Sequence, residues 1–309
     1  MPTSAGFDAA SSLERLREAR RRAQRALVDP APPTPADPAP PTGRAGRNLP
    51  QAIGVGLGLI ALLLFSLYFD IRIFVGLAAV VIAAGVWEVA RAVTLRSIRV
   101  PLVPLWVGGV GMMVSAFVGG EAPLLMAFAL TCGAIVMWRV LEDGGLASIR
   151  DSATGMFIAT YLPFLASFAI LLARRPDGPW AVLTFVAVVV ANDTGGYAAG
   201  VLYGKHPMAP SISPKKSWEG FAGSLLLAVV VAVAMAVFAL DAPWWVGIAL
   251  AVAGVAASTV GDLSESLIKR DLGLKDMGSI LPGHGGIMDR LDSLLVAAPF
   301  VYVIVEHLA

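Results

Sequence analysis

Two pairs of acidic residues flank one polar segment near the C-terminus. Asp262 and Glu265 precede this segment, and Asp289 and Asp292 follow it. Each pair is spaced i, i+3, which places both carboxylates on one helix face, and Gly261 leaves room beside the first pair. Carboxylates from two helix ends suit a hard cation such as Mg²⁺, which takes oxygen ligands and leaves positions for substrate phosphates. The structural alternative is that Asp289 caps a helix while Asp292 stays in solvent.

A glycine-rich turn, Pro282-Gly283-His284-Gly285-Gly286, stands just before the second pair. Its glycines allow positive φ and let a backbone approach a ligand closely. Arg290 and the basic residues of the segment converge on the same place. Zinc is a poorer match than magnesium, because the histidines at 206, 284 and 307 lie in different segments without metal-ligand spacing.

Another acidic group, Asp193, lies within an apolar run next to Asn192. A charge at that depth in a membrane costs at least about 2.5–3.5 kcal/mol unless a partner or a cavity compensates it. We therefore expect Asp193 to be functional. A buried ion pair with Arg139 or Arg91 is the structural alternative, and the glycines at 195 and 196 could serve close helix packing alone.

A basic loop, Ser211–Gly220, opens the following apolar run with the sequence SISPKKSWEG. Its Lys215 and Lys216 stand beside the hydroxyls of Ser213 and Ser217, a set suited to binding a polyphosphate. Lysines at an inner membrane boundary are also what membrane topology alone would supply.

The elements that position these groups must be transmembrane helices. Of the 309 residues, 57% are hydrophobic and only 15% are charged, whereas soluble domains carry about 25% charged residues. This composition excludes a disordered chain and an ordinary soluble enzyme. The net charge of +1 gives no basic field for nucleic acid, so we expect no nucleic-acid partner. Cys132, the only cysteine, cannot form an internal disulfide.

We predict an all-α, polytopic integral membrane protein with about nine spans, because only helices satisfy their backbone groups in lipid. Short loops at 70–72, 119–121 and 241–243 separate several of these spans. The predicted spans are 51–69, 73–93, 101–118, 122–139, 153–173, 179–201, 218–240, 243–263 and 290–307.

Three regions follow from this pattern: a basic, proline-rich tail over 1–50, N-terminal transmembrane helices over 51–175, and a catalytic transmembrane region over 176–309. The tail is predicted to be mobile and cytoplasmic, with docking to anionic lipid as the alternative. If the N-terminus is cytoplasmic, all but Arg72, Arg174 and Arg175 of the 23 lysines and arginines lie on the inner side. The polar motifs then share the cytoplasmic side.

The stretch from Ser266 to Asp292 resembles the signature of the phosphatidate cytidylyltransferases, also called CDP-diacylglycerol synthases. It reads S-L-I-K-R, four residues, K-D-M-G, two residues, and L-P-G-H-G-G-I-M-D-R-L-D, without a departure from the family pattern. The SPKKSWEG loop and the Asn-Asp-Thr segment at 192–194 are also similar, although Ser217 stands where Thr is more frequent. The resemblance covers residues 180–293, and the first four spans match only in hydrophobicity.

This resemblance implies transfer of CMP from CTP to phosphatidate, giving CDP-diacylglycerol and pyrophosphate, by a Mg²⁺-dependent, homodimeric enzyme of the plasma membrane. On this reading Asp262 and Asp289 bind one or two cations directly, and Asp193 and Asp292 are further ligands or support them. The remaining catalytic assignments are Lys215 and Lys216 on the CTP phosphates, Lys269 and Arg270 on the phosphatidate headgroup or pyrophosphate, His284 as a hydrogen-bond donor, and Arg290. The nucleotide-binding assignments are Asn192, Ser213, Ser217, Lys275, Gly285 and Gly286.

Two other classes share some of these features. A secondary transporter also has intramembrane acids, but it predicts inverted repeats and carboxylates near the midplane. A CTP-using polyprenol kinase or an alcohol phosphotransferase shares the membrane setting. The paired pattern DGxxAR and GxxxDxxxD of the phosphotransferases is absent.

Overall fold

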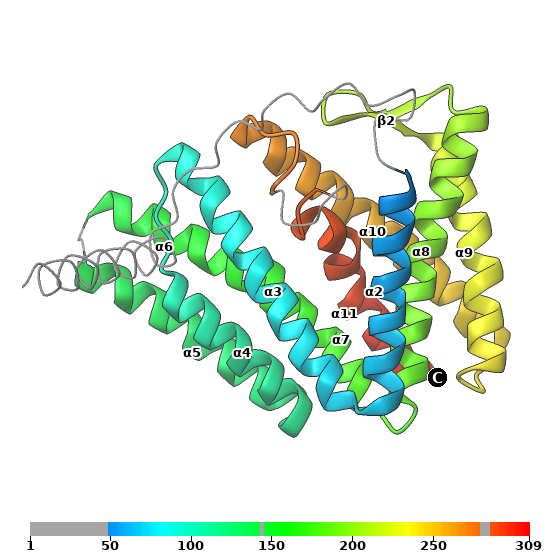
Figure 1. Ribbon diagram of the computed structural model, residues 1–309, viewed down its shortest axis with the longest axis horizontal. Helices are drawn as coiled ribbons and strands as arrows, with labels where there is room; N and C mark the ends of the chain where they lie inside the picture. Colours follow the sequence, from blue (N-terminus) through cyan, green and yellow to red (C-terminus); the bar gives the residue numbers. More distant parts are fainter. Residues whose placement is uncertain (1–48, 143–144, 279–284) are drawn as a thin grey trace, which may run out of the picture.

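Long apolar helices make up nearly all of the described chain (Figure 1). The computed structural model describes residues 49–142, 145–278 and 285–309. The predicted tail, apart from its last two residues, and the predicted donor His284 lie outside these ranges. The helices are α2 (Leu49–Phe69), α3 (Ile71–Val93), η1 (Thr94–Arg96), α4 (Leu102–Gly119), α5 (Glu121–Glu142), α6 (Leu146–Ala159), η2 (Thr160–Phe164), α7 (Leu165–Arg174), α8 (Gly178–Tyr203), α9 (Trp218–Phe238), α10 (Trp244–Leu272) and α11 (Met288–Leu308).

Eight helical segments of the described chain are long and apolar enough to cross a membrane. They include one continuous segment, Leu146–Arg174, that joins α6, η2 and α7. In α2 the apolar stretch Gly56–Phe69 is shorter than these eight. The predicted fold class, an all-α polytopic membrane protein, is confirmed.

The predicted short loops are also present. Asp70 alone separates α2 from α3, and its Oδ1 accepts a hydrogen bond from the backbone nitrogen of Arg72 at 2.8 Å, which caps α3. Gly120, with φ of +83°, joins α4 to α5. Residues 239–243 join α9 to α10. These tight turns place successive helices antiparallel to one another.

Helix α10 extends nine residues beyond its predicted end, through a stretch that we expected to be a loop. It ends at Gly273, whose φ of +74° is the left-handed conformation that stops helices. The backbone nitrogens of Gly273 and Leu274 donate to the carbonyls of Arg270 and Lys269 at 3.1 and 2.8 Å. The extension places Glu265 and Lys269 one turn apart on the same helix.

Helix α6 continues into α7 through the wide turn η2. Pro163 lies inside this turn and has no backbone N–H to donate, so the regular helical ladder cannot pass through it. Tyr161 in the same turn directs its hydroxyl to the carbonyl of Gly261 at 3.4 Å. The irregular turn therefore contacts α10 beside the predicted acidic pair.

A small hairpin replaces the predicted loop between α8 and α9. Its strands, β1 (Pro207–Ala209) and β2 (Ser213–Ser217), are antiparallel, with Pro207 opposite Ser217 and Ala209 opposite Ser213. Ser217 ends β2 and caps α9, because its Oγ accepts from the backbone nitrogen of Gly220 at 3.1 Å. The hairpin thus fixes the basic loop to the start of α9.

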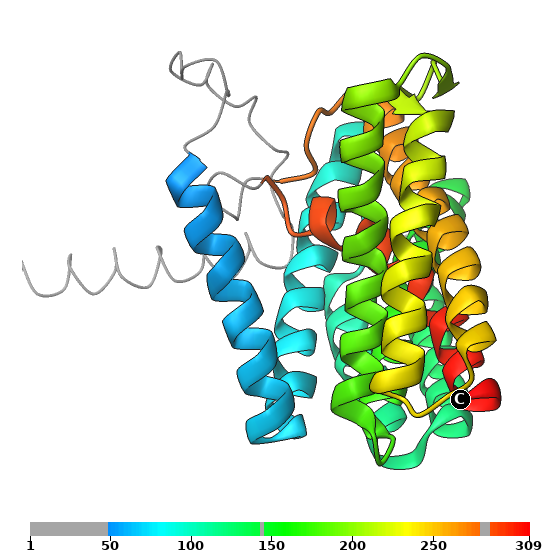
Figure 2. The same cartoon turned by 90° about the vertical axis from the view of Figure 1, so that its right-hand side faces the viewer.

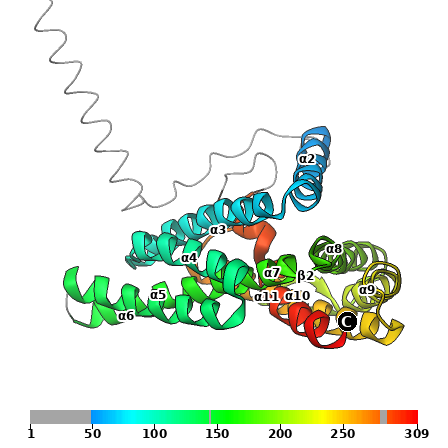
Figure 3. The same ribbon diagram turned by 90° about the horizontal axis from the view of Figure 1, so that it is seen from below.

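The helices form one bundle around α7 and α11 (Figure 3). Helices α8, α9 and α10 pack side by side on one side of this centre, and α3 to α6 lie on the other side. Helix α2 packs mainly along α3 and stands apart from the rest (Figure 2). The bundle brings the C-terminal half of α8, the hairpin, the end of α10 and the start of α11 to one end (Figure 1).

Candidate active site

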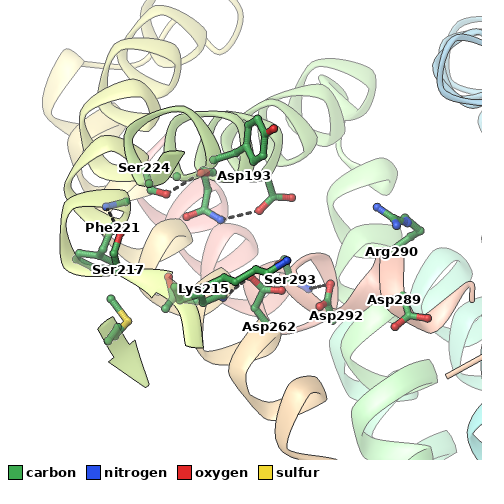
Figure 4. Close-up of a pocket in the computed structure, with 18 residues that line it drawn as sticks. Asp193, Lys215, Ser217, Phe221, Ser224, Asp262, Asp289, Arg290, Asp292 and Ser293 are labelled. Carbon is green, nitrogen blue, oxygen red and sulfur yellow. Dashed lines mark hydrogen bonds and ion pairs between the residues drawn. The ribbon is translucent and has the colours of Figure 1, made fainter. Parts of the chain in front are cut away.

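A cavity of about 390 Å³ opens at this end of the bundle, between α8, α9, α10, α11 and β2 (Figure 4). It gathers most of the polar groups singled out from the sequence. Its lining includes Asn192, Asp193, Tyr197, Lys215, Lys216, Ser217, Ser224, Thr259, Asp262, Asp289, Arg290, Asp292 and Ser293.

Three carboxylates from three helices face one another in the cavity: Asp193 of α8, Asp262 of α10 and Asp292 of α11. Asp262 and Asp292 lie within hydrogen-bonding distance of each other, and Asp193 is close enough to Asp262 for their charges to repel. Asp292 is only 7% exposed, and its Oδ1 accepts from the backbone nitrogen of Ser293 at 2.8 Å. Carboxylates this close repel each other unless a proton or a cation lies between them.

Close helix packing makes this meeting possible. A β-carbon added at Gly261 would lie 2.3 Å from the carbonyl oxygen of Asp292, so α10 and α11 approach there more closely than any side chain permits. The backbone of α11 fills the space that Gly261 leaves beside the first acidic pair. Between α8 and α9, a β-carbon on Gly195 would lie 2.5 Å from the carbonyl oxygen of Gly223.

Lys216 of β2 forms an ion pair with Asp262. Lys215, its neighbour, is exposed and lines the cavity, with no hydrogen bond or ion pair to any residue that the structure describes. A second cavity of about 410 Å³ adjoins the first and is lined by both lysines, Ser217 and Lys205. The two lysines therefore line both cavities, with Lys215 available to an anionic ligand.

A second ionic group lies beside the first. Lys269 bridges Glu265 and Asp289, with its Nζ 2.8 Å from Asp289 Oδ1. The other oxygen of Asp289 accepts from the backbone nitrogens of Met277 and Gly286, both at 3.0 Å. Protein donors thus occupy both oxygens of Asp289, as in the capping alternative raised above. Asp292, by contrast, is buried and not in solvent.

Asn192 joins the same site through its side chain. Its Nδ2 donates to Asp193 Oδ1 at 2.9 Å. The backbone carbonyl oxygen of Asn192 accepts from Ser224 Oγ at 2.6 Å. Its Oδ1 is buried without a hydrogen-bond partner among the described residues. A buried oxygen of this kind is costly, and a bound cation or donor would compensate it.

The structural alternative for Asp193 involved Arg139 or Arg91. Arg139 instead pairs with Asp151 at 2.8 Å and with Glu142 at 2.5 Å, at the α5–α6 junction. The guanidinium of Arg91 stacks over the ring of Trp87 at 4.7 Å. The positive charges that act on Asp193 are those of Lys216 and Arg290.

Several predicted site residues do not reach the cavity. Arg270 is exposed, and its Nε donates to the carbonyl of Ile212 at 3.2 Å, so it braces the hairpin. Ser213 pairs with Ala209 in the hairpin, and Lys275 is exposed in the turn after α10. Neither lines the cavity.

Gly285 and Gly286 lie at the start of α11 beside Asp289. Gly285 has φ of +82°, as expected for a glycine turn. A β-carbon on Gly286 would lie 2.9 Å from Asp289 Oδ2 and 2.8 Å from Glu88 Oε2. The absence of a side chain at Gly286 lets both carboxylates approach its backbone.

Glu88 of α3 is a residue that our sequence analysis missed. It is 2% exposed and accepts a hydrogen bond from the backbone nitrogen of Met288 at 3.0 Å. The signal was present, because a glutamate inside an apolar run is expensive in a membrane and is a candidate functional group. Its partner lies 200 residues away, which spacing along the sequence does not reveal.

Known proteins match most of the chain. The model of the cytidylyltransferase family matches residues 50–308. A protein named phosphatidate cytidylyltransferase from Mycobacterium leprae is 43% identical over 272 residues, which are 83% of this chain and 87% of the relative. One of the same name from Mycobacterium bovis is 39% identical over 279 residues, covering 86% and 91%. Another from Haemophilus influenzae is 42% identical over 154 residues, covering 46% and 53%.

Proposed function

The chain belongs to the cytidylyltransferase family, and we propose that it is a phosphatidate cytidylyltransferase whose reaction takes place in the cavity between α8, α9, α10, α11 and β2. It transfers CMP from CTP to phosphatidate and releases pyrophosphate. The observation that carries the location is the meeting of Asp193, Asp262 and Asp292 beside Lys215 and Lys216.

The chemistry requires positioning more than proton transfer. Phosphatidate is a phosphate monoester with a second pKa near 6, so it is largely dianionic at neutral pH and needs no strong general base. One of its oxygens attacks the α-phosphorus of CTP, and the bond from that phosphorus to the β-phosphate oxygen breaks. The main obstacle is the repulsion between two anionic substrates, which fixed positive charges reduce.

The donor set fits Mg²⁺. Asp193, Asp262, Asp292 and the unpartnered Oδ1 of Asn192 offer only oxygen ligands at one cavity. Within the described ranges, no group of three or more His, Cys, Asp or Glu is arranged so that it could hold a metal ion. Mg²⁺ suits such a partial set, since it is commonly held by one or two carboxylates together with substrate phosphates and water.

The cation would therefore be held by Asp262 and Asp292, with Asp193 and Asn192 beside them. When bound, it would neutralise phosphate charge during the transfer. Asp289, which we predicted as a direct ligand, is better suited to holding Met277, Gly286 and Lys269 together, because these protein donors occupy both its oxygens.

The cationic side chains divide into those that face the cavity and those that brace it. Lys215 would contact the phosphates of CTP, and Lys216 would exchange between Asp262 and a bound phosphate. Arg290 lines the cavity and would neutralise the lipid phosphate or the pyrophosphate. Lys269 would act through Glu265 and Asp289, and Arg270 through the hairpin.

In the proposed topology the protein lies in the plasma membrane, and this end of the bundle faces the cytoplasm. Of the described lysines and arginines, only Arg72, Arg174 and Arg175 belong to the opposite end, which supports a cytoplasmic site by the positive-inside rule. CTP would enter from the cytoplasm while the acyl chains remain in the bilayer. The family resemblance also predicts a homodimer, which light scattering in detergent would check.

The direct test is an assay of the purified protein with CTP labelled at the α-phosphorus and, separately, at the γ-phosphorus. With phosphatidate present, we expect the α-label to enter lipid and the γ-label to leave as pyrophosphate. A kinase would move the γ-label into lipid, and a transporter would modify neither substrate. Either result would contradict the proposal.

A further inference from the structure

Helix α3 contributes a buried acidic side chain to the beginning of α11. Glu88 is 2% exposed, and it accepts a hydrogen bond from the backbone nitrogen of Met288, the first residue of α11, at 3.0 Å. The first backbone N–H groups of a helix have no partner inside the helix, and the helix dipole favours negative charge there. Glu88 therefore stabilises the start of α11 from a different helix.

The same carboxylate packs against two glycines, Gly278 and Gly286. A β-carbon on Gly278 would lie 2.2 Å from Glu88 Oε1, and one on Gly286 would lie 2.8 Å from Glu88 Oε2. Real β-carbons do not approach oxygen this closely, so glycine at both positions is what lets these two parts of the backbone approach the carboxylate. Glu88 thus contacts the chain at Gly278, in the stretch that follows α10, and again at the start of α11.

Asp289 holds the two ends in a complementary way. Its Oδ2 accepts from the backbone nitrogens of Met277 and Gly286, one from each end. Two carboxylates, one from α3 and one from α11, therefore fasten residues 277–278 to residues 286–288. Arg290 and Asp292, which line the cavity, follow directly on α11.

We propose that Glu88 is a positioning residue for CMP transfer. By binding the first residue of α11 and packing against Gly278 and Gly286, it sets the place of Arg290 and Asp292 relative to Asp262. This inference rests on the proposed function. It also assigns a role in the site to the N-terminal helices, which the family signature does not include.

The first test compares Glu88→Gln and Glu88→Ala with Glu121→Gln in the full-length protein in detergent. We expect Glu88→Ala to lower kcat per folded protein about 10²-fold, since a small displacement of catalytic groups has effects of this size. Glu88→Gln keeps an oxygen acceptor and should recover part of that loss. KM for CTP should change little in either variant, because the cavity lysines are not displaced. Glu121 accepts from Tyr302 at the opposite end of the bundle, so its variant should retain wild-type kcat.

The second test asks whether Glu88 acts through the contact described. Gly278→Ala alone should lower kcat strongly, because its methyl group would collide with Glu88. In the Glu88→Ala background the same change should cost less than about twofold, since coupled residues are not additive. Multiplicative losses would contradict the contact.

The outcomes separate this inference from the proposed function. If wild-type protein forms no CDP-diacylglycerol, the proposed function fails. If wild type is active and Glu88→Ala retains wild-type kcat per folded protein, the positioning role is wrong. A loss of activity per total protein that equals the fraction of each variant unfolded, measured by thermal unfolding, would also overturn it, because Glu88 would then have a purely structural role.

Discussion

Asp262 interacts with more of the charged groups in the cavity than one ion pair would involve. It pairs with Lys216, lies within hydrogen-bonding distance of Asp292 and repels Asp193. Neutralising it would remove a proposed metal ligand and release the lysine. Both effects act on the reacting phosphates more than on the packing of α10.

Asp262→Asn should lower kcat about 10²–10³-fold, the cost typical of losing one group that stabilises the transition state. The side chains are similar in shape, so thermal unfolding in detergent should change little. Steady-state CMP transfer would measure the effect. Asp271→Asn, an exposed change nine residues along the same helix, is the matched control. Near-normal transfer by Asp262→Asn would exclude it as a metal ligand.

The two hairpin lysines should have separable effects. Lys215→Ala should raise KM for CTP about 10-fold or more with little change in kcat, because Lys215 is free to bind the nucleotide phosphates. Lys216→Ala should lower kcat, because Lys216 also balances the charge of Asp262. Initial rates at varied CTP would measure both, with the exposed Arg99→Ala as control. If Lys215→Ala leaves KM for CTP unchanged, its assignment is wrong.

The identity of the acidic residues could be predicted from the sequence, because charges within apolar runs are rare and costly. Their roles were less predictable. Asp289 turned out to bind backbone nitrogens, and Arg270 braces the hairpin. A lysine or arginine in a basic loop can turn toward the cavity or away from it, and the sequence pattern is the same in both cases.

At the scale of the elements, the closest approach of α10 and α11 decides the site. Gly261 leaves no space for a side chain beside the backbone of Asp292. Both helices carry a cavity carboxylate within one turn of this contact. Any separation of the helices at Gly261 would therefore move Asp262 away from Asp292.

Gly261→Ala should destabilise the protein by about 1–3 kcal/mol, the usual cost of overpacking, and should lower CMP transfer more than this stability loss explains. Thermal unfolding and transfer assays on the same sample would separate the two effects. Gly133→Ala in α5, where an added β-carbon meets nothing within 4 Å, is the control and should leave both unchanged. An active, stable Gly261→Ala protein would contradict the close packing.

Element boundaries could be predicted where the sequence has a clear stop. Asp70 and Gly120 ended their helices as expected, and the loop predicted at 241–243 lies within the longer connection 239–243. The extension of α10 to Leu272 was missed, because a charged, amphipathic continuation resembles a loop when only hydrophobicity is followed. Gly273, with its left-handed conformation, was the signal that marked the true end.

At the scale of the whole molecule, the two ends of the bundle differ in charge. The cavity and hairpin lie at the end that carries most of the described lysines and arginines. Pairings between distant segments, such as α3 with the start of α11, could not be predicted, because apolar helices offer many equivalent neighbours.

The proposed orientation can be tested with single cysteines in a Cys132→Ser background. Ser211→Cys lies in the hairpin turn beside the cavity, and Asp241→Cys lies in the turn between α9 and α10 at the opposite end. In intact bacterial cells, a membrane-impermeant maleimide should label only Asp241→Cys, and after permeabilisation it should label both. Labelling of Ser211→Cys in intact cells would reverse the topology.

The most direct test of the central claim, that acidic side chains of separate helices hold a cation beneath the nucleotide, is binding of Mn²⁺ in place of Mg²⁺. Paramagnetic resonance of the purified protein with a non-hydrolysable CTP analogue would count bound ions. We predict that wild type and Asp271→Asn bind Mn²⁺, and that Asp262→Asn and Asp292→Asn lose it while remaining folded. Unchanged Mn²⁺ binding in both cavity variants would contradict the account.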